Sequence, residues 1–197
     1  DVIKLLQTKS GATGILANSN NFQIGDSVTQ IVENNFRNAV SKSHTAAHMV
    51  HASLRNILGS HVAQAGSHVA PGRFRFDFSH TSKVSTEELD TIFKEANSHV
   101  FKDLEVNTNI MGIEKAKEEG ALAFFGDKYD DDVRVVSIGD FSKELCGGTH
   151  VANSHDVGLI VLTGESSIGS NLRRVEMLSG AEAYEFLRNA YNSYDNV

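Results

Sequence analysis

The sequence contains a single cysteine in 197 residues, no apolar run near the ~20 residues that a membrane-spanning helix requires, and no recognisable signal peptide. Because Cys146 has no partner within the chain, an internal disulfide is excluded and a reducing compartment is indicated. We therefore expect a cytoplasmic globular protein with no membrane segment. The chain begins at Asp1 rather than methionine, from which we expect either a piece of a longer protein or a chain from which a tag has been removed.

Basic residues are also scarce, with 18 lysines and arginines against 25 acidic residues and a net charge of −7. This balance argues against binding of nucleic acid through bulk electrostatics. It leaves room for local basic patches, and two short clusters, Arg73 with Arg75 and Arg173 with Arg174, could hold an RNA backbone. The alternative is that all four are ordinary strand-face arginines.

Two pairs of potential metal ligands provide the strongest chemical signal in the sequence. His44 and His48 are four residues apart and would share one face of a helix, while Cys146 and His150 flank two glycines that allow a tight loop. Together they supply the three imidazoles and one thiol of a tetrahedral zinc site. Taken separately, each pair could instead consist of ordinary surface or core residues with no role in binding a metal. A zincin protease is disfavoured because Thr45 stands where the HExxH motif requires glutamate.

The first forty residues combine turn-forming residues at 10–14, 18–21 and 25–26 with short apolar stretches such as 27–32, which favours small β hairpins. A helical period appears near Phe36. Ser43 has the character of an N-cap, and Gly59 is a natural end for the helix. His44, His48, His51 and Arg55 would then form one stripe. His51 could be a spare ligand or a support for the other ligands, but we expect it to pack against a neighbouring helix.

Residues 73–80 alternate strictly, so three phenylalanines should line one face of a strand and charged residues the other. Ser85 begins a capping box that opens a further helix. Strands are also predicted at 133–138, 157–162 and 172–178, with a final helix over 181–191. The irregular alternation predicts an α+β fold, a mostly antiparallel sheet packed with helices, with Cys146 on a loop beside the sheet.

Several motifs in this order resemble the editing region of alanyl-tRNA synthetases and their free-standing relatives. They lie at residues 43–48, 64–67, 73–80, 125–129, 144–150 and 173–176. The resemblance covers roughly residues 35–180 and implies that residues 35–197 form a zinc-containing tRNA editing domain. Residues 1–34 look like the tail, or remnant, of the small β-barrel that precedes this domain in the full synthetase.

The resemblance implies a hydrolase that removes serine or glycine wrongly attached to alanine tRNA, with zinc held by His44, His48, Cys146 and His150. Such editing is needed because a pocket that accepts alanine cannot strongly reject the smaller glycine. Zinc could polarise the ester carbonyl, activate a water or anchor the substrate, and the sequence does not choose among these roles. The partners implied are the acceptor end of mischarged alanine tRNA and the other domains of the parent synthetase, whose aminoacylation core is absent from these residues.

Around the metal, Gln64 matches a pocket position of the family, where its amide could bond the serine hydroxyl or the ester, and Thr45 could cap the helix or line the pocket. Family members often carry threonine where this chain has Ala47, and an apolar residue where it has His68. Asp77 is better interpreted as an ion-pair partner on the strand than as a general base. Two alternatives stay open: a tRNA-binding module with a purely structural zinc, and a threonyl-type editing module.

Overall fold

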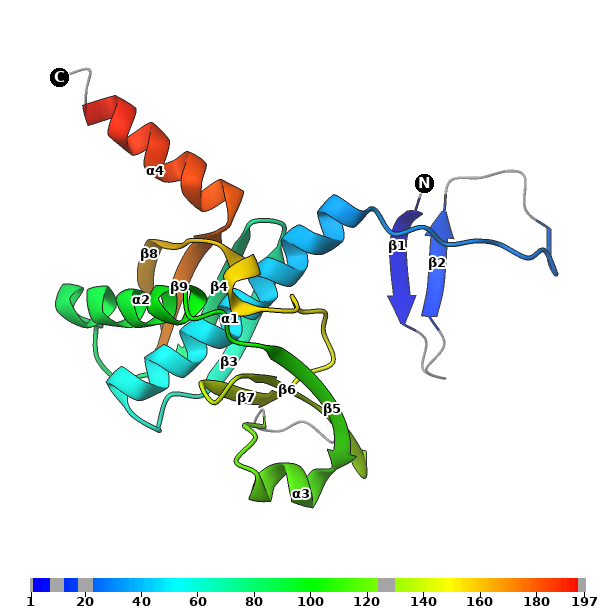
Figure 1. The fold of residues 1–197 in the computed structure, drawn as a ribbon, viewed down its shortest axis with the longest axis horizontal. Helices are drawn as coiled ribbons and strands as arrows, with labels where there is room; N and C mark the ends of the chain where they lie inside the picture. The colour runs from blue at the N-terminus through cyan, green and yellow to red at the C-terminus, as the bar shows by residue number, and fades with distance from the viewer. Residues whose placement is uncertain (1, 8–12, 18–22, 124–129, 195–197) are drawn as a thin grey trace. The chain divides into compact units, whose positions relative to one another are not determined.

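The computed structural model describes residues 2–7, 13–17, 23–123 and 130–194, which belong to two separately compact units, Asp1–Val32 and Glu33–Val197 (Figure 1). In the first unit, β1 (Val2–Gln7) pairs antiparallel with β2 (Thr13–Ala17). The described residues contain no closed barrel, so the barrel remnant is not confirmed, and the division into 1–34 and 35–197 stays a prediction.

Three sequence features fall outside the described residues. Most of the expected turn at 10–14 lies there, as do the whole of the turn at 18–21 and the whole of the motif at 125–129. Residues 27–32 are described and form neither helix nor strand, so the hairpin predicted there is wrong. Its apolar side chains, Val28, Ile31 and Val32 among them, are exposed because no described strand lies alongside to bury them.

The long helix α1 (Asn34–Leu58) begins close to Phe36, where the helical period was expected. Glu33 is its N-cap, because the Glu33 carboxylate accepts hydrogen bonds from the first backbone N–H groups of the helix. The N-cap predicted at Ser43 is therefore wrong, and Ser43 is instead a buried interior residue whose hydroxyl lies 3.0 Å from that of Ser179. The predicted end is confirmed: Gly59 is the C-cap, with a φ of 112° that favours glycine.

Two antiparallel sheets and the helices complete the second unit, which confirms the predicted α+β class. The larger sheet has the order β3-β4-β9-β8, built from Gln64–Ala70, Arg73–Ser79, Leu172–Ser179 and Ile160–Gly169. The smaller has the order β5-β6-β7, built from Val106–Gly112, Asp132–Ile138 and Ser142–Leu145. The remaining helices are α2 (Thr86–Val100), α3 (Ile113–Glu118), the 3-10 helix η1 (Ser154–Val157) and α4 (Ala181–Tyr194).

The main core lies between the four-stranded sheet and the helices α1 and α2. Phe74, Phe76 and Phe78 on β4 are buried as the alternation predicted, and Ser85 closes its capping box at the start of α2. The strand expected from residue 157 begins instead at Ile160, because residues 154–157 form η1. The core fixes α1 against the sheet and so fixes His44 and His48, two of the three histidines that α1 carries.

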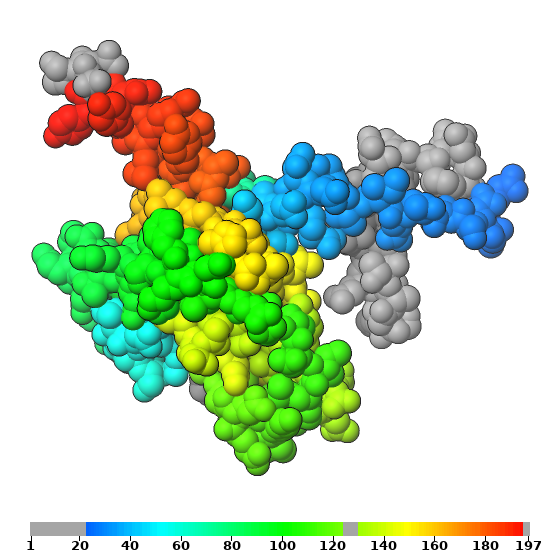
Figure 2. Space-filling view, viewed as in Figure 1, coloured from blue at the N-terminus to red at the C-terminus, as the bar shows by residue number. Residues whose placement is uncertain are grey.

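The last helix, α4, projects from the second unit and ends near the C-terminus (Figure 2). Among its residues only Ala183 is buried. None of the described helices is both long enough and apolar enough to cross a membrane.

Candidate metal centre

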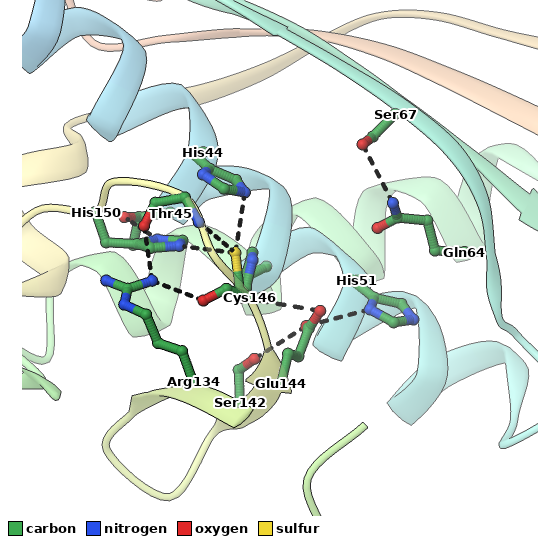
Figure 3. A network of polar contacts seen from close by, with 12 residues as sticks. His44, Thr45, His51, Gln64, Ser67, Arg134, Ser142, Glu144, Cys146 and His150 are labelled. Atoms are coloured by element: carbon green, nitrogen blue, oxygen red, sulfur yellow. Dashed lines mark hydrogen bonds and ion pairs between the residues drawn. The ribbon is translucent and has the colours of Figure 1, made fainter. Parts of the chain in front are cut away.

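The four predicted ligands come together from two parts of the chain (Figure 3). His44 and His48 lie on successive turns of α1, while Cys146 and His150 lie on the loop that leaves β7. One ligand atom from each of these residues lies within 4.8 Å of the others. The cluster could therefore hold a metal ion, as the sequence predicted from residue type and spacing.

The spacing within the cluster matches tetrahedral coordination. Sγ of Cys146 lies 3.5 Å from Nε2 of His44 and 3.4 Å from Nε2 of His150. With zinc–sulfur and zinc–nitrogen bonds of about 2.3 and 2.05 Å, a tetrahedral site places sulfur and nitrogen about 3.5 Å apart. One thiol and three imidazoles also suit zinc in chemical type. The donor set thus fits the metal that the family resemblance implies.

The loop that carries Cys146 and His150, here called the ligand loop, passes so close to α1 that it requires glycine at one position. A Cβ atom on Gly148 would lie only 2.1 Å from Cε1 of the His44 ring, whereas one on Gly147 would meet nothing within 4 Å. Arg134 on β6 secures the loop, since its guanidinium donates hydrogen bonds to the carbonyls of Cys146 and Gly148 at 2.6 and 2.7 Å. Of the two glycines singled out in the sequence, Gly148 is the one that permits the close approach.

Burial sets the protonation of the ligands. It lowers the pKa of His44 to about 4, with the neighbouring His48 adding to the effect, and it lowers the pKa of His150 to about 2, with help from His48 and His44. Burial also lowers the pKa of His48 and raises the pKa of the Cys146 thiol. The imidazoles are therefore neutral near pH 7 and can donate their lone pairs to a metal, whereas the thiol must lose its proton on binding.

Thr45 contacts the ring of His150, one of the four predicted ligands. Its side chain is fully buried, and its hydroxyl lies 3.0 Å from Nδ1 of His150 and accepts a hydrogen bond from the backbone N–H of Val151 at 3.2 Å. The hydroxyl thus holds both the ring and the backbone of the ligand loop. The catalytic role expected for Thr45 stays a prediction, and the contacts observed are those of a positioning residue.

Gln64, the other residue expected in the pocket, is the first residue of β3. Its amide nitrogen donates a hydrogen bond to Oγ of Ser67 at 3.2 Å. In Figure 3 these two side chains are drawn apart from the four ligands, and no dashed line joins the two groups. Its role in the reaction stays a prediction.

Sequence reasoning missed two residues that hold the site, Arg134 and Glu144. Glu144 is buried beside His48 and His51. Burial alone would raise the pKa of Glu144, but the electrostatic interaction with the His48 ring and the hydrogen bonds with His51 and Ser142 hold it below its ordinary value. The one available signal was its place in the sequence, because Glu144 lies only two residues before Cys146.

The four arginines predicted to bind RNA lie on β4 and β9, which pair in the larger sheet, and they differ in their contacts. Arg73 and Arg75 are exposed on β4. Arg174 makes two hydrogen bonds to the Asp77 carboxylate, at 2.6 and 2.8 Å, which confirms the ion-pair role expected for Asp77. Arg173 pairs with Glu165 at 2.6 Å. Arg173 and Arg174 thus take part in ion pairs with neighbouring strands, and the RNA-binding role of all four arginines stays a prediction.

A cavity of about 600 Å³ adjoins the cluster on the His150 side. It runs along the first part of α1 and past the start of α4, and its charged lining consists of Lys42, Asp156 and Glu182. Mixed charge of this kind favours no single ligand. The cavity does give the loop that carries His150 one open side.

Residues 133–176, which run from β6 to β9 and include the ligand loop, match the family described as the threonyl and alanyl tRNA synthetase second additional domain. This match relates that segment to a domain that threonyl and alanyl tRNA synthetases share. Its 133–176 segment contains Cys146 and His150, and α1 contributes the other two ligands from outside the matched residues.

Curated relatives distinguish between the two synthetases. The chain is 42% identical over 192 residues to an alanine–tRNA ligase of Clostridioides difficile, covering 95% of the chain and 22% of that protein. It is 52% identical over 151 residues to the enzyme of Streptomyces avermitilis, covering 77% and 17%, and 46% identical over 174 residues to that of Lysinibacillus sphaericus, covering 88% and 19%. The chain belongs to the alanyl-tRNA synthetase family and corresponds to its editing region, so the resemblance is confirmed. It spans about a fifth of the length of these relatives.

Proposed function

We propose that this chain hydrolyses the ester bond between alanine tRNA and a wrongly attached serine or glycine, at a zinc ion held by His44, His48, Cys146 and His150. The observation that carries the proposal is the ligand cluster, whose sulfur–nitrogen distances of 3.4 and 3.5 Å suit zinc. The similarity to alanine–tRNA ligases supplies the substrate class. A free thiol as ligand fits a reducing compartment, so we propose the cytoplasm as the location.

Some residues of the protein would hold the metal ligands in position, and others would contact the substrate. Zinc bound at the cluster would supply a Lewis acid that polarises the ester carbonyl, activates a water or anchors the amino acid. Thr45 and Arg134 keep the ligand loop in place. Gln64 is proposed to hydrogen-bond the serine hydroxyl or the ester, and the partly exposed faces of His44 and His150 leave one side of the cluster open to substrate.

Two proposed partners extend beyond the chain. The acceptor end of mischarged alanine tRNA is the substrate, and Arg73 and Arg75 offer exposed cations for its phosphates. The other domains of the parent synthetase would deliver the tRNA, since the relatives are about five times longer than the matched region.

A second candidate is a tRNA-binding module in which zinc only joins the loop to α1. The specific observation in its favour is that four protein ligands converge, because a site closed by four protein side chains is usually structural. The threonyl-type alternative has weaker support, since the relatives compared are alanine–tRNA ligases.

Deacylation of serine-charged alanine tRNA tests the proposal. The chain is assayed with and without a zinc chelator, and beside Cys146→Ala whose fold is checked by circular dichroism. We expect hydrolysis that the chelator abolishes and that zinc restores, and a folded Cys146→Ala protein without activity. A folded, zinc-loaded chain that releases no serine even when joined to the remaining synthetase domains would support the structural role instead.

A further inference from the structure

Each ligand histidine has one ring nitrogen directed at the cluster and one directed at the protein. For His44, Nε2 faces Cys146, and the ring is also hydrogen-bonded to the backbone of Thr149. For His150, Nε2 faces Cys146 and Nδ1 faces the Thr45 hydroxyl. In both cases the protein-side partner fixes the orientation of the ring and therefore which nitrogen is free to bind a metal.

His48 differs from the other two. Its Nδ1 is buried and has no hydrogen-bond partner among the described residues, and it lies 3.8 Å from Oε2 of Glu144. A buried, unpaired ring nitrogen is costly, and a hydrogen bond to a carboxylate needs a separation of about 2.7–2.9 Å. A movement of about 1 Å would therefore join the two groups.

Glu144 is held in the orientation that such a bond requires. It is 1% exposed. Its other oxygen, Oε1, already has two partners, Nδ1 of His51 at 3.1 Å and Oγ of Ser142 at 3.2 Å. The His51 ring is itself packed against Phe76, with the ring centroids 4.9 Å apart. These contacts, drawn as dashed lines from Glu144 in Figure 3, restrain Oε1. They leave Oε2 as the oxygen that lies near Nδ1 of His48.

We propose that Glu144 is a positioning residue for the metal centre, and that its Oε2 accepts a hydrogen bond from Nδ1–H of His48 so that Nε2 of His48 is left to bind zinc. His51 and Ser142 complete the arrangement by holding the carboxylate. Being buried beneath His48, Glu144 does not reach substrate. The inference rests on the proposed function only in taking zinc as the metal.

The experiment measures zinc affinity by competition with a chromogenic chelator, without any tRNA. Glu144→Gln keeps the size of the side chain but loses the charge and offers only one acceptor oxygen. We expect its zinc affinity to fall about 10- to 100-fold. The matched control is Asp77→Asn, the same chemical change at a buried carboxylate that pairs with Arg174 in the sheet, which should bind zinc as the unmodified chain does.

A second readout separates positioning from general loss of structure. Nitrogen NMR of the His48 ring in the metal-free protein should show the proton on Nδ1 in the unmodified chain and a mixture of tautomers in Glu144→Gln. Should Glu144→Gln fail to fold, Ser142→Ala retains the carboxylate and removes one of its supports, and a smaller loss of affinity is expected.

Zinc affinity of a folded Glu144→Gln within about threefold of the unmodified chain, with an unchanged His48 tautomer, would overturn the inference. Because neither measurement involves tRNA, this failure is distinct from failure of the proposed hydrolysis. A chain that loses zinc in Glu144→Gln but never deacylates tRNA would support the inference and refute the proposed function.

Discussion

The Thr45 hydroxyl lies 3.0 Å from Nδ1 of His150, although the two residues are 105 positions apart in the chain. It also accepts the backbone N–H of Val151. Thr45 stands between His44 and the turn that carries His48, so this one hydroxyl ties the helix that bears one ligand pair to the loop that bears the other. The site is therefore assembled by hydrogen bonds that do not themselves involve a metal.

Thr45→Val tests this link, since valine keeps the shape of threonine and removes the hydroxyl. We expect zinc affinity to fall about 10-fold, because His150 and the Val151 N–H both lose their partner. Chelator competition measures the effect. Thr149→Val, the same change on an exposed residue of the same loop, is the control and should leave zinc affinity unchanged. Equal affinities in the two variants would contradict the role given to Thr45.

The two loop glycines provide a matched pair for a steric test. In Gly148→Ala the new methyl group would lie 2.1 Å from the His44 ring, so the ring or the loop must shift. We expect zinc affinity to fall by about 10-fold or more, as it does when a residue that orients a metal ligand is lost. Gly147→Ala introduces a methyl group into open space and should bind zinc normally. Both affinities come from the same competition assay, and a normal Gly148→Ala protein would show that the loop is not confined as described.

The lowered pKa values predict how the metal-free protein responds to acid. The pKa of His44 is lowered to about 4 and that of His150 to about 2 in the folded state, so both bind protons more readily once unfolded. Their contribution to stability is present above the ordinary pKa of about 6.5 and is lost as the pH falls toward 4. The free energy of unfolding should decrease by at most about 1.4 kcal/mol per pH unit for each histidine in this window.

Urea unfolding of the chelator-treated protein at pH 7, 6 and 5 measures this slope. His44→Asn removes one of the two titrating rings, so its free energy of unfolding should depend less steeply on pH. A slope that is the same with and without His44 would show that its pKa is not lowered in the folded protein.

The two arginine pairs should behave differently when one member is replaced. Arg75→Ala removes an exposed cation, so tRNA binding should weaken and its salt dependence should fall by about one charge, while the melting temperature stays the same. Arg174→Ala leaves the buried Asp77 carboxylate without its partner, so the melting temperature should fall. Binding titrations at several salt concentrations, together with thermal melts, separate the two results. Loss of stability in Arg75→Ala would contradict this division.

Much of the fold could be predicted because its signals are local. The alternation of residues 73–80 predicted β4, the capping box at Ser85 predicted α2, and Gly59 predicted the end of α1. The helical period also placed the start of α1 near Phe36, but its N-cap could not be predicted in the same way. Ser43 looks like an N-cap in the sequence, but its hydroxyl partner is Ser179, 136 residues away, which only packing brings near.

The sequence by itself determined the ligand set, because helical spacing orients His44 and His48 alike and the only thiol lies four residues before a histidine. Tertiary structure alone decided what surrounds those ligands. Packing of α1 against β7 and the ligand loop brings Thr45 into contact with His150 and places Glu144 beside His48. Pairing of β4 with β9 places Arg174 where it forms an ion pair with Asp77. The physical reason is that periodicity specifies which way a side chain points along its own element, whereas burial between distant elements specifies what it meets.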